Sequence, residues 1–215
     1  MCYNKDISIY TYIIGLITSY LLIINDSKTL KIIGWFYIFA IQMQLVEYFL
    51  WTNNTCNSKN IQISKIGAFL NFIQPIILYL AILYFNKEIT DEHKKIINIT
   101  MILYVIALII FVIRILPIGC SILTDCSAPY LQWSWMYEKT PSYIFTYFPI
   151  AIMLLLYFGL EKPYNLYLSL ICIISFIASF IIYRKQRAFG NIWCWFAVFI
   201  PIGILIYDKF FINTH

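Results

Sequence analysis

Charged residues are scarce in this chain. Only 12% of its 215 residues are Asp, Glu, Lys or Arg, whereas 62% are hydrophobic and the mean hydropathy is +0.79. Water-soluble domains contain about 25% charged residues. A chain with so few cannot bury its apolar surface inside one water-soluble core. We therefore predict an integral membrane protein that has the bilayer as its solvent.

Histidine is nearly absent as well. The two histidines are His93, in a charged stretch, and His215, the last residue. A catalytic zinc site and a Ser–His–acid triad both need histidine among other polar groups, and neither pattern occurs. The sequence also contains no P-loop and no dinucleotide-binding fingerprint. We expect no metal and no cofactor, and we favour a non-enzymatic protein.

Long runs of Lys or Arg are missing too. The formal net charge of +5 is modest, and the densest basic stretch, Arg184-Lys185-Gln186-Arg187, is short and follows an apolar segment. Nucleic-acid partners are usually indicated by longer basic blocks. We expect no nucleic-acid partner and predict contacts with membrane lipids, whose headgroups attract basic side chains at the ends of spans.

Long apolar segments make up most of the rest. A helix that crosses a bilayer needs about 20 mainly apolar residues, and continuous rather than alternating runs favour helices. The expected fold class is an all-α, polytopic, seven-transmembrane-helix bundle. It forms one domain over residues 1–215, with a long outer loop at 117–142. The seven segments are Ile7–Ile24, Leu30–Trp51, Ile66–Phe85, Ile96–Leu116, Tyr143–Leu160, Leu166–Tyr183 and Ile192–Tyr207.

The orientation in the membrane is predicted from cysteines. Lys and Arg do not decide it, because eight fall on one side of the bundle and seven on the other. Cys2, Cys56, Cys120 and Cys126 share the side of the N-terminus with a glycosylation acceptor at Asn53. Because disulfides persist in oxidising compartments, we predict an outside or lumenal N-terminus. Cys120 is expected to pair with either Cys56 or Cys126.

Polar side chains lie inside two of the apolar segments. In the second segment Gln44 and Glu47 share one helix face, and in the third Asn71 and Gln74 do so. Polar groups at membrane depth are costly and usually face a protein interior or a wet cavity. If these two adjacent helices turn the polar faces toward each other, they form an outward-opening pocket.

Further residues are expected around this pocket. Arg114, at the end of the fourth segment, is a candidate partner for Glu47, and Trp133, Trp135 and Trp195 are expected to roof the pocket. Each feature also has a structural alternative. The amides can join helices without binding anything, and Glu47 can be solvated near the interface. The tryptophans can form an aromatic belt, Arg114 can snorkel, and the cysteines can stay unpaired.

Two short motifs carry a resemblance. They are Gln44-x-x-Glu47-Tyr48-x-x-x-Trp51 and Gly190-Asn191-Ile192-Trp193-Cys194-Trp195. Together they resemble stretches of uncharacterised multi-pass membrane proteins encoded by giant DNA viruses. The resemblance covers a small part of the chain. It implies a membrane location, in a host or virion membrane, and nothing about mechanism.

Three functions are compatible with this sequence. The leading hypothesis is a binding, channel or transport module whose outward-facing pocket takes a small polar solute, a proton or a lipid headgroup. The second is a membrane scaffold that recruits partners through its aromatic loop or through the Asn86–Lys95 loop. The third is a membrane-embedded lipid-modifying enzyme that uses a carboxylate and Cys194.

Overall fold

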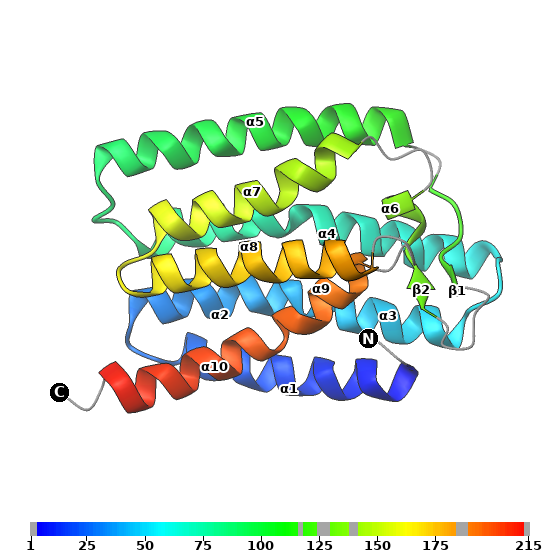
Figure 1. The fold of residues 1–215 in the computed structure, drawn as a ribbon, viewed down its shortest axis with the longest axis horizontal. Helices are drawn as coiled ribbons and strands as arrows, with labels where there is room; N and C mark the ends of the chain where they lie inside the picture. The colour runs from blue at the N-terminus through cyan, green and yellow to red at the C-terminus, as the bar shows by residue number, and fades with distance from the viewer. Residues whose placement is uncertain (1–3, 116–117, 124–129, 138–141, 184–188, 213–215) are drawn as a thin grey trace.

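The structure is a computed structural model, and it describes residues 4–115, 118–123, 130–137, 142–183 and 189–212 (Figure 1). Helices account for most of it. They are α1 (Lys5–Ile23), α2 (Lys28–Ala40), α3 (Gln42–Thr52), α4 (Ser58–Phe85), α5 (Asp91–Ile115), α6 (Ser134–Tyr137), α7 (Ser142–Gly159), α8 (Tyr164–Tyr183), α9 (Phe189–Ala197) and α10 (Phe199–Tyr207), followed by a π-helical turn, η1 (Asp208–Ile212). Two short strands, β1 (Ile122–Leu123) and β2 (Leu131–Gln132), pair in antiparallel fashion. The expectation of a helical fold is confirmed.

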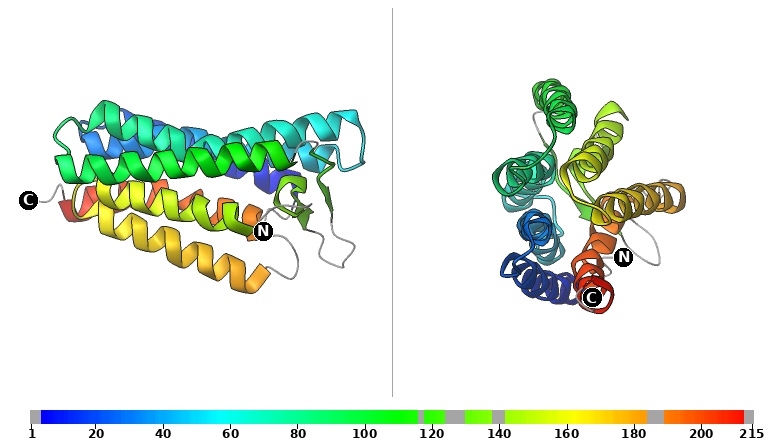
Figure 2. Two further views of the ribbon diagram at one scale, coloured as in Figure 1. Left: turned by 90° about the horizontal axis from the view of Figure 1, so that it is seen from above. Right: turned by 90° about the vertical axis from the view of Figure 1, so that its left-hand side faces the viewer.

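The long helices run side by side along one axis (Figure 1). We call the end that carries β1, β2 and α6 the hairpin end. The other end holds the short connections 24–27, 86–90 and 160–163, and we call it the turn end. The main helix pairs are α1 with α2, α2 with α4, α5 with α7, and α7 with α8. Seen along the axis, α5 and α8 lie at the periphery (Figure 2).

Six of the described helical segments are long and apolar enough to cross a membrane. They include the peripheral α5 and α8, most of whose side chains lie outside the packed interior. The fifth predicted segment becomes α7, whose described apolar part, Tyr147–Gly159, is shorter than that length. By length and composition the structure therefore supports six spans, and a seventh through α7 stays a prediction.

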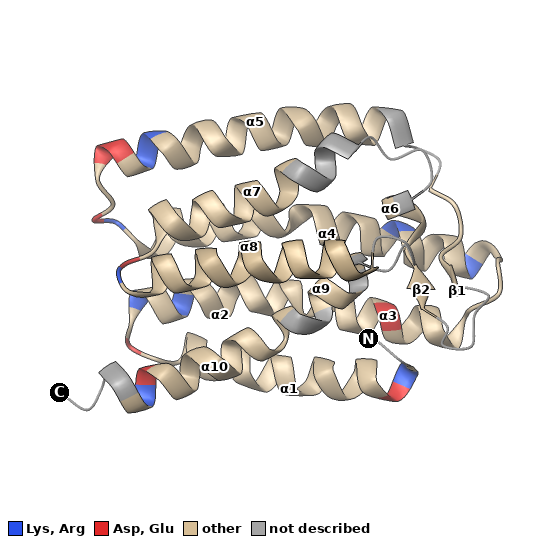
Figure 3. Ribbon diagram, viewed as in Figure 1, with Lys and Arg blue, Asp and Glu red and all other residues tan. Residues whose placement is uncertain are grey.

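Charged side chains gather toward the two ends of the bundle, and the middle is almost free of them in the described chain (Figure 3). Toward the hairpin end, α3 carries one acidic position, which is Glu47 (Figure 3). This distribution is the one that a chain needs in order to place its ends in water and its middle in hydrocarbon.

Two predicted segments are interrupted in the structure. The second is divided into α2 and α3 at Ile41, and the seventh into α9 and α10 at Val198. At the first interruption the Gln42 side chain donates a hydrogen bond from Nε2 to the Ile38 carbonyl at 2.9 Å. At the second, Pro201 has no N–H to offer to the carbonyl of Ala197, four residues earlier.

A buried polar network attaches the described part of the long loop to α4. Asn60 donates from Nδ2 to the carbonyls of Asn53 (2.7 Å) and Ser121 (2.9 Å), and its Oδ1 accepts from the Ser121 N–H (2.9 Å). The Ser121 hydroxyl lies 2.8 Å from the Ser64 hydroxyl, and its Oγ accepts from the Ser134 N–H. All four side chains are buried. The described part of the loop is therefore packed against the bundle.

A disulfide reinforces this attachment. Cys56 and Cys120 are bonded, with their Cα atoms 5.4 Å apart. This is one of the two pairings that the sequence left open. The other candidate partner, Cys126, lies outside the described residues. The disulfide joins the residues just before α4 to the loop one residue before Ser121. The disulfide and the polar network therefore attach the same part of the loop to α4.

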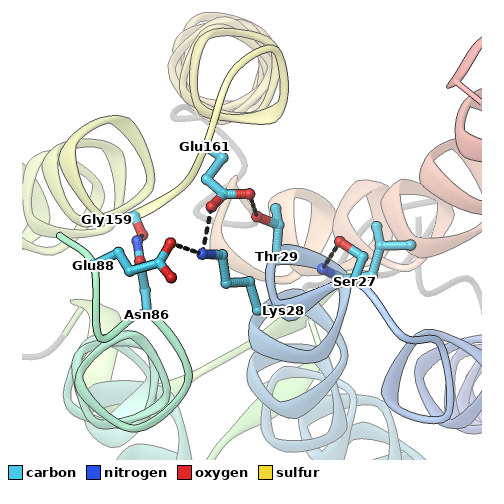
Figure 4. Close-up of polar contacts among 8 residues, drawn as sticks. Ser27, Lys28, Thr29, Asn86, Glu88, Gly159 and Glu161 are labelled. Atoms are coloured by element: carbon cyan, nitrogen blue, oxygen red, sulfur yellow. Dashed lines mark hydrogen bonds and ion pairs between the residues drawn. The ribbon is translucent and has the colours of Figure 1, made fainter.

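The turn end is held by a charged clasp (Figure 4). Lys28 lies between Glu88 and Glu161, with N···O distances of 2.6 and 2.9 Å. Nearby, Asn86 donates from Nδ2 to the Gly159 carbonyl at 3.0 Å. These contacts join the first residue of α2 and the end of α7 to the connections 86–90 and 160–163, which are far apart in sequence.

The clasp predicts a small acid-sensitive contribution to stability. A hydrogen bond from Lys28 and the positive charge of that side chain lower the pKa of the Glu88 carboxyl below its usual value. A carboxyl whose pKa is lower in the folded than in the unfolded state stabilises the fold at pH values above its unfolded-state pKa. This stabilisation is lost as the pH falls through its folded-state pKa. We expect the melting temperature of Glu88→Gln to fall less than that of the wild type between about pH 5 and pH 3. Glu92→Gln is the control. An equal fall in melting temperature for the wild type and Glu88→Gln would contradict the prediction.

Candidate functional site

The four polar residues predicted to surround a pocket are all inside the bundle. The exposed fractions are 1% for Gln44, 0% for Glu47, 4% for Asn71 and 5% for Gln74. We call these residues the polar quartet. The first two project from α3 and the last two from α4, and α3 packs against α4. The quartet therefore faces protein rather than hydrocarbon.

The quartet does not converge on a single point. The Thr11 hydroxyl of α1 donates to Gln44 Oε1 at 2.9 Å, so Gln44 is turned toward α1. Glu47 points about 60° away from Gln44 around α3, because residues at i and i+3 of a helix differ by that angle. α3 contacts α4 and α9 as well as α1, so the two side chains face different parts of its surroundings.

Two cavities lie beside the α4 members of the quartet. The central cavity has a volume of about 50 Å³ and includes Gln74 in its wall, together with Cys172 of α8 and Cys194. The small cavity, of about 10 Å³, includes Asn71 and Trp133. Cys194 and Trp193 line both cavities. These two residues of α9 therefore join the surroundings of Asn71 to those of Gln74.

The wall of the central cavity offers hydrogen-bonding groups. Among the described residues, none bonds to Gln74 Nε2, although this atom is buried. An amide N–H without a partner costs about 1–3 kcal/mol in a protein interior, and a bound water or solute would remove that cost. Ser175 Oγ, also in the wall, accepts a hydrogen bond from Trp193 Nε1 at 3.0 Å. Ala197, whose carbonyl receives no bond from Pro201, is a third wall residue.

The loop tryptophans are packed inside the hairpin end of this region. Trp133 and Trp135 stack with ring centroids 5.0 Å apart and are 2% and 0% exposed. A Cβ on Gly67 would lie 2.6 Å from the Trp135 ring, so α4 needs glycine at this point. Large apolar side chains gain most when they are fully removed from water, which accounts for this burial. The sequence predicted that these rings roof an outward-opening pocket, and that role stays a prediction.

Other predicted residues are placed as follows. Arg114 lies in α5 and Trp195 in α9, but their side chains fall outside what the structure describes, and their roles stay predictions. Asn53 ends α3 at the hairpin end, where its Nδ2 donates to the Phe49 carbonyl at 2.8 Å and to the Thr52 hydroxyl at 3.1 Å.

Several residues of this region were not predicted as site residues. They are the cavity residues Cys172, Ser175 and Trp193 and the network residues Asn60, Ser64, Ser121 and Ser134. One signal was available: Leu168, Cys172 and Ser175 are spaced i, i+4, i+7 and all line the central cavity. The network had no such signal, because its members come from three segments that meet only in the folded chain.

Within the described part of the chain, no three His, Cys, Asp or Glu side chains are grouped so as to hold a metal ion. Comparison of the chain with protein-family models, curated proteins and solved structures found no match. The resemblance to viral membrane proteins therefore stays a prediction.

Proposed function

We propose that this chain is a multi-pass integral membrane protein that binds and passes protons or water through an internal polar site. Its membrane location is supported by six helical segments of sufficient length and apolarity. The charge-poor middle of the bundle supports it as well (Figure 3). On this proposal α7 crosses the membrane as a seventh span, because it lies between α5 and α8 and packs against both.

The observation that carries the functional proposal is the burial of Glu47. Its side chain is 0% exposed and lies on a helix that is otherwise free of charge in its described part. Ionisable side chains at membrane depth are expensive, and those that persist usually serve ion or proton pathways. Its helix, α3, contacts α9, and Cys194 of α9 lines both cavities. A proton held by Glu47 would therefore be close to an interior space that can hold water.

The volumes of the two cavities limit the size of the ligand that they can hold. A water molecule needs about 10–15 Å³ of cavity volume, whereas sites for metabolite-sized ligands occupy about 300–1,000 Å³. The central cavity of about 50 Å³ has room for a few waters, and the small cavity of about 10 Å³ has room for one at most. This size favours water or a proton over a larger solute such as a lipid headgroup.

A row of buried polar residues on α4 lies on the hairpin side of this site. Asn60, Ser64, Asn71 and Gln74 are buried and follow one face of the helix from the hairpin end inward. With a rise of 1.5 Å per residue, Gln74 lies about 24 Å along the axis from Ser58, the first residue of α4. The row therefore extends from the hairpin end to more than half-way along the helix.

The hairpin end is proposed to face the outside or a lumen. The Cys56–Cys120 disulfide lies at this end, and disulfides persist in oxidising compartments. The glycosylation acceptor at Asn53 lies at the same end. On this orientation, the polar row of α4 begins on the outer side and the charged clasp faces the cytosol.

Proton flux in liposomes tests the proposal. Purified protein in vesicles that contain a pH-sensitive dye is expected to dissipate an imposed pH gradient. Glu47→Gln is expected to lower the rate at least tenfold, because glutamine cannot release a proton. Gln74→Leu is expected to lower it less, because it removes one hydrogen-bonding group from the cavity wall. Gln62→Leu, an exposed position on α4, is the control.

The second candidate, a membrane scaffold, is favoured by a different observation. The polar network of Asn60, Ser64, Ser121 and Ser134 is internally bonded, and its evident effect is to fix the loop. If wild-type vesicles hold their pH gradient while the protein in them remains folded, the conducting function is rejected and the scaffold is retained. Flux that is equal in the wild type, Glu47→Gln and Gln74→Leu would also reject the proposed site.

A further inference from the structure

Two hollows of different character meet at the turn end, far from the polar quartet. One is a polar hollow of about 900 Å³ bordered by Asp26, Glu161, Lys162 and Asp208. The other is an apolar groove of about 430 Å³ between α8 and α10. Tyr164 and Tyr207 border both. Each volume falls in the range of about 300–1,000 Å³ that is usual for ligand sites.

The apolar groove exists because α8 packs against α9, whereas α10 runs away from α8 toward the turn end (Figure 1). Its walls include Ile171 and Phe199, both of which are exposed on the outer surface of the bundle. Gly203 leaves its middle open, since a Cβ there would meet no atom within 4 Å. In a membrane this groove faces hydrocarbon, so its natural occupant is an acyl chain.

The polar hollow has the opposite character. Three carboxylates and one lysine border it, so its charge is negative. Glu161 is paired with Lys28, and Asp208 accepts a hydrogen bond from the Tyr164 hydroxyl at 2.7 Å. Asp26 is exposed, and no described residue forms an ion pair with it. A ligand placed here needs a positive group to balance these charges.

Aromatic rings lie where the two hollows join. The Tyr207 ring centroid is 6.1 Å from that of Tyr164 and 5.5 Å from that of Tyr167, and both pairs are edge-to-face. Aromatic faces attract ammonium groups at distances up to about 6 Å. The junction thus combines carboxylates with electron-rich rings at the level where a lipid headgroup meets its chains.

From this juxtaposition we propose that the turn end binds a zwitterionic phospholipid. One acyl chain lies in the groove between α8 and α10, and the ammonium of the headgroup lies in the polar hollow beside Asp26 and the tyrosines. Lys162 is placed to meet the phosphate of the same lipid. The proposal rests on the proposed membrane location, and it is independent of the Glu47 site.

Lipid binding to the purified, delipidated full-length protein tests this. The probes are phosphatidylethanolamine, phosphatidylcholine and phosphatidylglycerol, each added in mixed micelles, with bound lipid counted by native mass spectrometry. We expect the two zwitterionic lipids to bind at least fivefold more tightly than phosphatidylglycerol. The comparison of ethanolamine with choline shows which ammonium the hollow prefers, and a preference for either supports the proposal.

Two variants separate the groove from the hollow. Gly203→Leu fills the groove and is expected to lower zwitterionic lipid binding at least fivefold, whereas Ile206→Phe, which adds bulk to α10 outside the groove, leaves it unchanged. Asp26→Asn is expected to reduce the preference over phosphatidylglycerol, and Asp91→Asn, on α5, leaves it unchanged. Unaltered binding by Gly203→Leu, or equal binding of all three lipids to the wild type, would overturn the proposal. Neither result bears on the proposed proton flux through Glu47, which is tested separately.

Discussion

Replacing Asn60 by leucine will destabilise the protein by about 3 kcal/mol, because a similar volume is kept while buried hydrogen bonds are lost. The Asn60 amide donates to the carbonyls of Asn53 and Ser121 and accepts from the Ser121 N–H. Leucine leaves both carbonyls without this donor, and each orphaned group costs about 1–3 kcal/mol. Since proteins are stable by only about 5–15 kcal/mol, the loss will be large.

The measurement is thermal unfolding in detergent together with hydrogen exchange of the loop. We expect a lower melting temperature and faster exchange at the Ser121 and Ser134 amides before the rest of the bundle opens. The Cys56–Cys120 disulfide keeps the loop close to α4, so the effect is local first. Gln62→Leu, on the exposed face of the same helix, is the control. Unchanged exchange at Ser121 in Asn60→Leu would show that the network does not hold the loop.

The second large effect is expected at Gly34, where α2 crosses α1. A Cβ on this residue would lie 2.8 Å from the Ser19 carbonyl oxygen and 2.9 Å from the Ile23 nitrogen. Both are backbone atoms, which cannot turn aside as a side chain can. Overpacking of this kind costs about 1–3 kcal/mol and sometimes more. Gly34→Ala is therefore expected to lower the free energy of unfolding, even though alanine is the better helix former.

Gly203→Ala provides the matched control. The substitution is chemically identical and also lies within a helix, but a Cβ at Gly203 meets no atom within 4 Å. Here only the helix propensity changes, and we expect stability to rise by up to about 1 kcal/mol. If Gly34→Ala lowers the free energy of unfolding while Gly203→Ala raises it, the Gly34 effect comes from the α1–α2 contact. If both substitutions stabilise the protein, the predicted overpacking at Gly34 is refuted.

The helical character of this chain was predictable because it depends on local features. Long apolar runs without alternation specify helices, and the short connections between them are rich in polar residues. The ends of helices were harder to place. The third segment was expected to begin at Ile66, whereas α4 begins at Ser58. Its first two turns carry Asn60 and Ser64, and these polar residues are buried only because residues 118–123 cover them.

The candidate site was predicted in part. Gln44, Glu47, Asn71 and Gln74 were expected to face the interior, and each is buried. Their expected convergence was only partial, since Gln44 bonds to Thr11 of α1. Helical spacing predicts which side chains share a face, but it does not predict which neighbouring helix that face contacts. The packing of α1 beside α3 decided that.

By itself, the sequence determined that the chain is helical, that its middle is apolar and that four polar residues are placed within it. These properties follow from composition and spacing along one segment at a time. The tertiary structure alone decided that Cys194 lines both cavities beside Asn71 and Gln74, that Trp133 and Trp135 fill the hairpin end, and that α8 and α10 diverge to leave a groove. Each depends on contacts between segments far apart in the chain, and such contacts are set by how whole helices pack rather than by local sequence.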